Sequence, residues 1–434
     1  MQELVPSATG LTKIVPMSVE DNSVNSLATR ARQASFELSS ASRALKDEAL
    51  RAMADALESS MAEVLSANKI DVDQARETGT PEAMIDRLAL DASRVAGMVG
   101  GLRKLVDLSD PVGEIVRGWN LANGVQIKQV RVPFGVVGMI YEARPNVTAD
   151  AAGVCLKSGN ASILRGSSSA LYSNRAIVKA LRSGLEASGL PVDSVSLVEG
   201  GHETTQQMMA ARGLIDVLIP RGGAGLINAV VENSKVPVIE TGTGNCHLFV
   251  DCAADLDIAE KIILNAKVQR PSVCNALETL LVHQEVAEDF IPRITDSLMA
   301  KGVTLHGNDK AVSLDSRIIA ARSDEFNAEY LSLDLAVKVV SDIDDAIEHI
   351  RTHTTGHSET IVTNDMVASN KFVSAIDAAA VLVNASSRFV DGGEFGFGAE
   401  IGISTQKLHA RGPMALQEMT STKYVITGEG QVRS

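Results

Sequence analysis

The sequence predicts an α/β protein with two regions, each built around a largely parallel sheet. Three observations favour this class. Short apolar segments alternate with helical segments from residue 134 to residue 234, and the alternation resumes from residue 246 to residue 384. The segments between the strands have the length of helical crossovers between parallel strands. We interpret the first region as a sheet of the Rossmann type and the second as a separate α/β unit with its own core.

The composition excludes some classes of function. A chain of 434 residues suggests two or three domains at roughly 150 residues each. Lys and Arg number 40 against 54 Asp and Glu, which gives a net charge of −14. Nucleic-acid binding needs cationic surface, and 9 Phe, 4 Tyr and 1 Trp are too few to suggest base-stacking platforms. We therefore expect no nucleic-acid partner.

The sequence shows no membrane or secretory segment. No stretch reaches the ~18 consecutive apolar residues of a membrane span. Residues 1–21 lack the cationic start and the continuous apolar run of a secretory signal. The four cysteines contain no Cys-x-x-Cys pair, which disfavours a disulfide framework or a zinc site. We expect a cytoplasmic protein with no metal site and no membrane contact.

The residues before position 110 are predicted to be helical after a loose lead-in. The first ~20 residues mix Ser, Thr, Pro and Gly without periodicity. From Val24 to about Leu108 the pattern is helical. Thr80 before Pro81 predicts a helix start, because proline is tolerated at the first position of a helix. One apolar stripe comprises Leu45, Leu50, Met53, Leu57 and Met61.

The following segments predict a hairpin and then the two sheets. Residues 110–131 alternate around Asn123-Gly124, and Asn-Gly is the strongest two-residue hairpin signal. In the first region we predict strands at 134–142, 161–166, 195–200 and 216–220 and helices at 148–159, 169–189, 202–213 and 226–234. In the second we predict strands at 246–251, 277–283, 336–340, 359–363 and 379–384 and helices at 255–269, 287–302, 343–353 and 366–376. Residues 416–430 predict one more exposed strand.

Cys274 is the cysteine that we single out as a candidate nucleophile. It lies just after a predicted helix and before a predicted strand, with Arg270 four residues away. A nearby cation favours the thiolate, which is the attacking form. Spacing alone leaves an unreactive thiol as the other interpretation. Cys155 and Cys252 stand in apolar segments and are expected to be buried, whereas Cys246 follows a Gly/Thr loop and stays open between the two roles.

Two turns after predicted strands suit an anion. Residues 221–225 read Arg-Gly-Gly-Ala-Gly; glycine lets a ligand approach the backbone, and free N–H groups at a helix start favour negative charge. Residues 165–169, Arg-Gly-Ser-Ser-Ser, form a second such turn with hydroxyls and a cation. A plain tight turn explains either one alone. Two of them at the carboxyl ends of parallel strands favour a ligand site, because ligands collect there.

His349, His353 and His357 are spaced by four and could resemble a metal-binding face. No carboxylate stands at a matching spacing, so we favour a solvated helix end. A hydrolase with a catalytic Cys/His pair is also possible. That function would not explain the alternation of strands and helices, which is typical of dinucleotide-binding domains.

Six sequence blocks together resemble the gamma-glutamyl phosphate reductase family of the aldehyde dehydrogenase superfamily. They are residues 140–153, 218–227, 265–283, 329–347, 356–363 and 395–413, and the similarity runs from about residue 25 to about residue 425. The resemblance implies an aldehyde dehydrogenase-like fold in three parts. These are an NADP-binding domain of residues 1–109 and 132–245, a catalytic domain of residues 246–405, and a β-flap for oligomerisation of residues 110–131 and 406–434.

The resemblance also implies a reaction. It is the NADPH-dependent reduction of L-glutamate 5-phosphate to L-glutamate 5-semialdehyde with release of phosphate, in proline biosynthesis. Cys274 matches the family nucleophile, which would form a thioester that a hydride then reduces. Asn146 matches the superfamily's oxyanion asparagine, with the Cys274 backbone N–H as its partner. Candidates for the substrate phosphate and carboxylate are Arg144, Arg270, Lys407, His409 and Arg411, although plain surface charge explains Lys407 and Arg411 equally well.

The same resemblance implies the cofactor contacts. Arg165, Ser167 and Ser168 occupy the turn near the adenosine ribose, where an arginine could bind the extra phosphate of NADPH. The pyrophosphate would lie against Gly222 and Gly223. The acid that holds the nicotinamide ribose is matched by Glu329.

Glu240 departs from what a reductase needs. It lies where oxidising aldehyde dehydrogenases carry a glutamate that activates water to hydrolyse the thioester. Hydrolysis would waste the intermediate of a reductase, so we expect Glu240 to have a structural or substrate role.

Two other functions stay open beside the reductase. One is an NAD(P)-dependent aldehyde dehydrogenase that oxidises a small aldehyde to the free acid, and the other is a catalytically silent scaffold. The resemblance also implies a homo-oligomer. Because the acyl phosphate is labile and must come from another protein, we expect a transient complex with glutamate 5-kinase.

Overall fold

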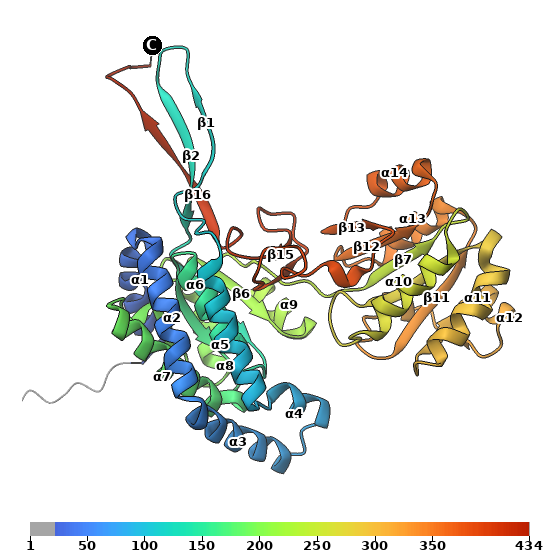
Figure 1. The fold of residues 1–434 in the computed structure, drawn as a ribbon, viewed down its shortest axis with the longest axis horizontal. Helices are drawn as coiled ribbons and strands as arrows, with labels where there is room; N and C mark the ends of the chain where they lie inside the picture. The colour runs from blue at the N-terminus through green and yellow to red at the C-terminus, as the bar shows by residue number, and fades with distance from the viewer. Residues whose placement is uncertain (1–21, 434) are drawn as a thin grey trace, which may run out of the picture.

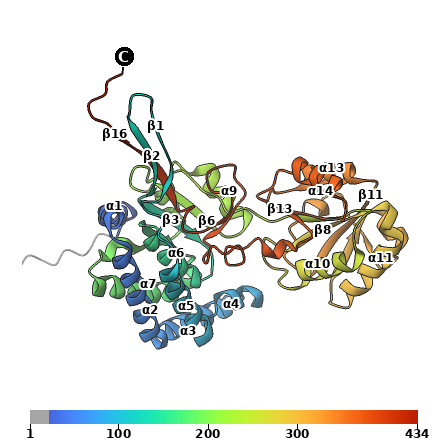
Figure 2. The same cartoon turned by 45° about the horizontal axis from the view of Figure 1, so that its top comes forward.

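The computed structural model describes residues 22–433. Two parallel sheets with their helices lie at the two ends of an elongated molecule, and a three-stranded ribbon projects from it (Figures 1 and 2). The predicted α/β class is confirmed. The lead-in predicted for the first ~20 residues lies outside the described residues. Among residues 22–433, no helix has both the length and the apolarity to cross a bilayer.

The helical pattern of the first hundred residues corresponds to five helices. They are α1 (Val24–Ser40), α2 (Arg43–Ser59), α3 (Met61–Glu77), α4 (Glu82–Leu88) and α5 (Ala92–Asp107). The Ser42 side chain caps α2 by accepting a hydrogen bond from Leu45 N at 3.3 Å. Of the predicted stripe, Leu50, Met53 and Leu57 have no exposed surface, while Leu45 and Met61 pack at the edge of the core. Helix α4 begins at Glu82, with Pro81 as its N-cap.

The first parallel sheet has the strand order β5-β4-β3-β6, which matches the 3-2-1-4 part of the six-stranded Rossmann sheet. Its strands are β3 (Val136–Tyr141), β4 (Ala161–Arg165), β5 (Val195–Leu197) and β6 (Val217–Arg221). The helices are α6 (Asn146–Lys157), α7 (Leu171–Ser188), α8 (His202–Ala210) and α9 (Ala224–Asn233). The register pairs Ile140 with Arg165 and Tyr141 with Arg221. The turns after β4 and β6 therefore flank the carboxyl end of β3.

The second parallel sheet has the order β10-β9-β11-β8-β7-β12-β13. Its strands are β7 (Cys246–Val250), β8 (Leu277–His283), β9 (Thr304–Gly307), β10 (Ile319–Ala320), β11 (Asp334–Val340), β12 (Ser358–Val362) and β13 (Ala380–Val383). The helices are α10 (Leu256–Val268), α11 (Gln284–Met299), α12 (Asp309–Leu314), α13 (Ile343–His353) and α14 (Met366–Ala375). Sequence reasoning missed β9, β10 and α12, because segments this short carry no readable periodicity.

The projecting ribbon is antiparallel, with β2 (Gln126–Pro133) between β1 (Ile115–Asn120) and β16 (Thr420–Thr427). The predicted hairpin and terminal strand are both confirmed. Leu121 N donates to Val125 O at 2.8 Å, so the loop has three residues rather than two, with Gly124 at φ +88°. The short elements are β14 (Gly402–Ser404), β15 (Gly412–Met414), η1 (Ser168–Ala170), η2 (Val192–Ser194), η3 (Glu325–Asn327) and η4 (Ser387–Phe389).

Candidate active site

Cys274 lies in the loop between α10 and β8, and its side chain is half-buried. Its backbone carbonyl accepts a hydrogen bond from Cys246 Sγ at 3.2 Å, and Cys246 begins the neighbouring strand β7. Cys246 itself is buried. Gly244 passes so close that a Cβ at that position would lie 1.5 Å from the Cys274 carbonyl oxygen. The position of the cysteine loop therefore requires glycine at 244.

The thiol of Cys274 is protonated at neutral pH in this structure. Burial raises the pKa of Cys274 to about 11, and Glu400 and Glu329 add to the rise, whereas Arg221 opposes it. The expected thiolate stabilised by Arg270 is therefore wrong. Arg270 is exposed, and the cation that acts most strongly on the thiol is Arg221, at the end of β6 in the other parallel sheet.

The raised pKa predicts a pH-dependent reactivity. We expect the rate of Cys274 alkylation by iodoacetamide to rise about tenfold per pH unit between about pH 7 and about pH 9, because only the thiolate attacks and its fraction grows tenfold per unit below the pKa. Mass spectrometry of the Cys274 peptide separates this reaction from that of the exposed Cys252. A rate that levels off below about pH 8 would contradict the raised pKa.

Guanidinium groups gather around Cys274. Arg144, Arg221 and Arg388 each interact electrostatically with the thiol, and Arg270 interacts with both Arg144 and Arg388. Desolvation, followed by repulsion from Arg87, Arg221 and Arg270, lowers the pKa of Arg144. Such a concentration of positive charge suits a ligand with a phosphate and a carboxylate.

Two members of this arginine cluster were expected at the site and two were missed. The structure brings the predicted Arg144 and Arg270 together. The sequence places Arg221 in an anion-binding turn and not at the thiol, although its position at the carboxyl end of a strand indicates a ligand site. Arg388 carried no signal, because it comes from the far end of the second region. Its Nη1 donates to Asn275 Oδ1, and its Nε donates to Gln269 Oε1 at 2.9 Å.

Asn146 is the first residue of α6, and its side chain is exposed. Asn146 Nδ2 donates to Asp150 Oδ2 at 3.1 Å. Burial raises the pKa of Asp150, while Asn146 and Arg221 favour its charged form. Asn146 is thus linked through Asp150 to the cation beside Cys274, but within residues 22–433 no hydrogen bond joins Asn146 to Cys274.

The remaining basic candidates lie in and beside the connection between β14 and β15. Lys407 and Arg411 both pair with Asp377; the Arg411 Nη2 to Asp377 Oδ1 distance is 2.8 Å. His409 packs edge-on against Phe134 and faces the Glu418 carbonyl oxygen at 3.3 Å. None of the interactions in the described part of the chain joins Lys407, His409 or Arg411 to the arginine cluster.

Five of the six predicted cofactor residues, all except Glu329, share one edge of the first sheet. Arg165 Nη2 donates to Gly201 O at 3.2 Å, and its Nε is buried without a partner in residues 22–433. Ser167 Oγ lies 2.8 Å from Ser169 Oγ, and Ser168 is exposed. After β6, Gly223 N donates to Glu142 Oε2 at 3.0 Å. These groups form a polar edge with an unsatisfied donor, which fits an anionic nucleotide.

Two glutamates were considered in the sequence. Glu329 Oε1 accepts a hydrogen bond from Gly244 N at 2.7 Å, and burial raises the pKa of Glu329. Glu329 therefore holds the segment that packs on Cys274. Glu240 is half-buried, and its backbone N donates to Gln406 Oε1 at 3.1 Å, so its main chain has a structural contact.

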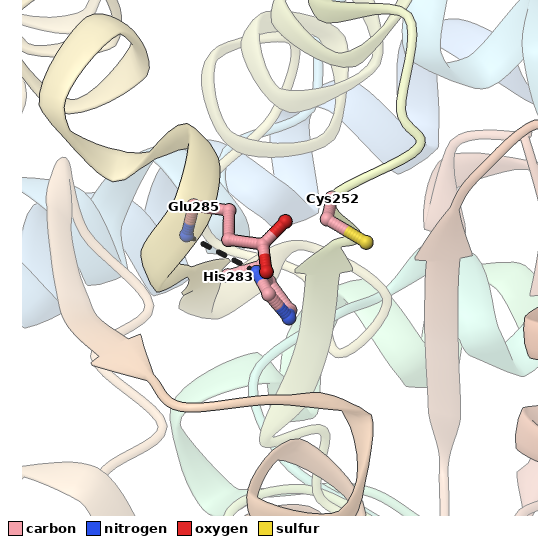
Figure 3. Close-up of side chains that lie close together, drawn as sticks. All are labelled: Cys252, His283 and Glu285. Carbon is pink, nitrogen blue, oxygen red and sulfur yellow. Dashed lines mark hydrogen bonds between the residues drawn. The ribbon is translucent and has the colours of Figure 1, made fainter.

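The environments of two other cysteines differ. Cys155 is buried as predicted, which raises its pKa to about 12. The prediction that Cys252 is buried is wrong, because it follows β7 on the surface. Figure 3 shows Cys252 beside His283 and Glu285, the one group of three potential metal ligands in residues 22–433.

Two of these three residues, His283 and Glu285, have an explanation without a metal. His283 caps α11, with its Nδ1 accepting from Glu285 N at 3.1 Å, so the neutral ring carries its proton on Nε2. Glu285 is an acid in the first helical turn, where the helix dipole favours it and disfavours a cation.

The prediction of a solvated helix end at the histidine triplet is wrong for two of its members. His349 and His357 are buried, and His353 is half-buried. Burial, with contributions from His247, Lys338 and His353, lowers the pKa of His349 to about 2. Burial lowers the pKa of His357 to about 4. His349 lies on α13 and His357 directly precedes β12, and both buried rings are neutral core groups.

Comparison with known proteins decides the family. The model of the aldehyde dehydrogenase family matches residues 4–328. A gamma-glutamyl phosphate reductase from Cutibacterium acnes is 59% identical over 406 residues, which cover 94% of this chain and 97% of the relative. The chain belongs to the gamma-glutamyl phosphate reductases of the aldehyde dehydrogenase family. A relative of the same name from Thermobifida fusca is 57% identical and covers 95% of this chain and 99% of its own length.

A solved structure agrees with this family. The crystal structure of gamma-glutamyl phosphate reductase from Thermotoga maritima superposes with a TM-score of 0.93 at 48% identity, over 94% of this chain and 99% of that chain. The expected aldehyde dehydrogenase-like fold of this gamma-glutamyl phosphate reductase family member is confirmed.

Proposed function

We propose that the chain reduces L-glutamate 5-phosphate to L-glutamate 5-semialdehyde with NADPH and releases phosphate, as a step of proline biosynthesis. The names of its relatives support this reaction. The observation that carries the proposal is the half-buried Cys274 among Arg144, Arg221 and Arg388. A nucleophile within a cationic cluster suits a substrate with an acyl phosphate and a carboxylate.

The residues divide the reaction between them. Cys274 Sγ attacks the acyl carbon, a C–S bond forms, the C–O bond to phosphate breaks, and inorganic phosphate leaves. With a pKa of about 11, the thiol must lose its proton by the time of this attack, and the departing phosphate takes up that proton. The arginine cluster orients the leaving phosphate and the substrate carboxylate. NADPH, held by the residues named below, would supply the hydride that takes the thioester to the aldehyde level. Cys274 is then released as the leaving group.

Asn146 is the proposed donor to the oxyanion, with the Cys274 backbone N–H. We expect Asn146→Ala to lower kcat by about 10²- to 10³-fold, because a lost oxyanion donor costs about this much. Thiol alkylation of Cys274 should stay unchanged, since the amide bonds to Asp150 and not to the sulfur. Steady-state kinetics with the alkylation control tests this role, and an unchanged kcat would remove Asn146 from the mechanism.

Arg165, Ser167, Ser168, Gly222, Gly223 and Glu329 are the residues that would hold the cofactor. Arg165 supports NADPH over NADH, because its buried Nε has no partner in residues 22–433 and a 2′-phosphate would satisfy it. The turn at Gly222 and Gly223 presents backbone N–H groups at the start of α9, which suits a pyrophosphate.

The direct test is the reverse reaction, NADP⁺ reduction with glutamate 5-semialdehyde. Phosphate or arsenate must be required, because the acyl group leaves the enzyme only by transfer to that oxyanion. An aldehyde dehydrogenase that makes the free acid reduces NADP⁺ without it. A scaffold reduces no NADP⁺ under either condition, so the assay separates all three functions.

We further propose a cytoplasmic homo-oligomer, with the domain division given by the resemblance. The ribbon supports assembly, because it exposes Ile115, Val116, Trp119, Tyr424 and Ile426. Light scattering of the whole chain tests oligomerisation. For the labile substrate we propose a transient complex with glutamate 5-kinase; a coupled assay in which an added trap intercepts all of the acyl phosphate would contradict it.

A further inference from the structure

Glu142 lies at the edge of the first sheet that faces the proposed cofactor site. It directly follows β3, and its exposed side chain accepts a hydrogen bond through Oε2 from Gly223 N at 3.0 Å. Gly223 is the N-cap of the ten-residue helix α9, so the carboxylate sits at the positive end of that helix. Gly222 leaves the space, because a Cβ there would lie 2.7 Å from the Glu142 carboxyl carbon.

The hydrogen bond from Gly223 N is the interaction that holds the Glu142 carboxylate within residues 22–433. No ion pair in residues 22–433 includes Glu142, although Arg144 is two residues further along the chain and the Arg221 backbone bonds to that of Glu142. Its main chain, in contrast, is fixed: Glu142 N donates to Arg221 O at 3.1 Å, and Glu142 O accepts from Arg144 N at 2.7 Å. The side chain can therefore turn away while β3 stays in place.

We propose that Glu142 is an internal competitor of the cofactor pyrophosphate. In the empty site its carboxylate takes the Gly223 N–H, and a binding cofactor displaces it. This inference rests on the proposed function, which puts the pyrophosphate at Gly222 and Gly223. The displaced carboxylate stays tethered beside the phosphates, where like charges repel. Glu142 thus sets the affinity and release of the cofactor, and takes no part in the chemistry at Cys274.

A second carboxylate at the same edge shows what distinguishes Glu142. Glu203 Oε1 accepts from Gly201 N at 2.7 Å, close to the start of α8. Its own and the Gly201 backbone N–H groups lower the pKa of Glu203, and Arg165 lowers it further. Glu203 therefore has a neighbouring cation, Arg165, that favours its charged form, whereas the Glu142 carboxylate pairs with no cation in residues 22–433 and would repel an incoming phosphate.

The test is Glu142→Gln, which removes the charge and keeps the size. We expect the Kd for NADPH to fall about three- to tenfold at low ionic strength, and the gain to shrink in high salt. Titration calorimetry measures it. Glu232→Gln is the matched control. Glu232 is exposed on α9, the helix that Gly223 caps, and its substitution changes the net charge by the same amount. Adenosine 2′-monophosphate lacks the pyrophosphate, so its affinity should not change in Glu142→Gln.

The outcomes separate this inference from the proposed function. Unchanged or weaker NADPH binding by Glu142→Gln, with normal binding by wild type and Glu232→Gln, overturns the inference and leaves the function standing. Failure of the wild type to bind NADPH overturns both. Glu142→Ser is a second variant with the same expected result, in case the glutamine keeps the hydrogen bond to Gly223.

Discussion

Replacement of Cys274 by alanine abolishes phosphate-dependent NADP⁺ reduction with glutamate 5-semialdehyde. We expect a loss of about 10⁴-fold or more, because no other group can form the acyl bond and the remaining binding groups give only residual catalysis. Cys246 cannot substitute, since it is buried and burial raises its pKa well above the usual range. The measurement is kcat of the purified variant with saturating phosphate.

Two variants control for this result. Cys252→Ala removes an exposed thiol just after the carboxyl end of β7. Cys274 lies at the other end of the sheet, before the first residue of β8, so kcat should stay unchanged. Glu240→Gln should keep most of the activity, because Glu240 bonds to Gln406 through its backbone N–H and not through its side chain. Turnover retained by Cys274→Ala would refute the thioester mechanism.

Gly244→Ala is expected to have the second largest effect. The added Cβ would lie 1.5 Å from the Cys274 carbonyl oxygen and 2.4 Å from its carbonyl carbon, so one of the two backbone segments must move. The same shift disturbs the Gly244 N–H bond to Glu329. A displacement of about 1 Å at a reacting group costs about 10²-fold in kcat. Overpacking of this kind also lowers the free energy of unfolding by about 1–3 kcal/mol.

Kinetics and denaturant unfolding of the same Gly244→Ala sample test both effects. Gly100→Ala is the control, because a Cβ on this exposed helical glycine meets nothing within 4 Å. It should preserve kcat and keep or slightly raise stability. Wild-type kcat in Gly244→Ala would show that the loop position does not constrain the nucleophile.

The architecture was readable from the sequence because local patterns report local structure. The alternation after residue 134 predicts both parallel sheets, and Asn123-Gly124 predicts the hairpin that became β1 and β2. The family blocks pointed to Cys274, which the structure places beside Arg144. Neither result required knowledge of contacts between distant segments.

Properties that depend on distant segments were not readable. Arg270 is close to Cys274 in sequence but exposed, whereas Arg221 and Arg388 reach the thiol from other elements. The thiol pKa follows from burial by the whole fold, and a neighbouring arginine in the sequence was a poor guide to it. Cys252 has apolar neighbours yet follows a strand end, where the chain turns to the surface. His349 is buried by the packing of α13.

The ribbon of β1, β2 and β16 leaves two strands with vacant backbone donors and acceptors along their outer sides. Such margins are templates onto which another polypeptide can add a strand, and the exposed Lys423 and the flanking polar residues leave the apolar side chains there uncovered. A single subunit therefore exposes an apolar ribbon with unpaired strand edges. The thermal midpoint of the protein should rise with protein concentration, because mass action favours the associated state in which the ribbon is covered.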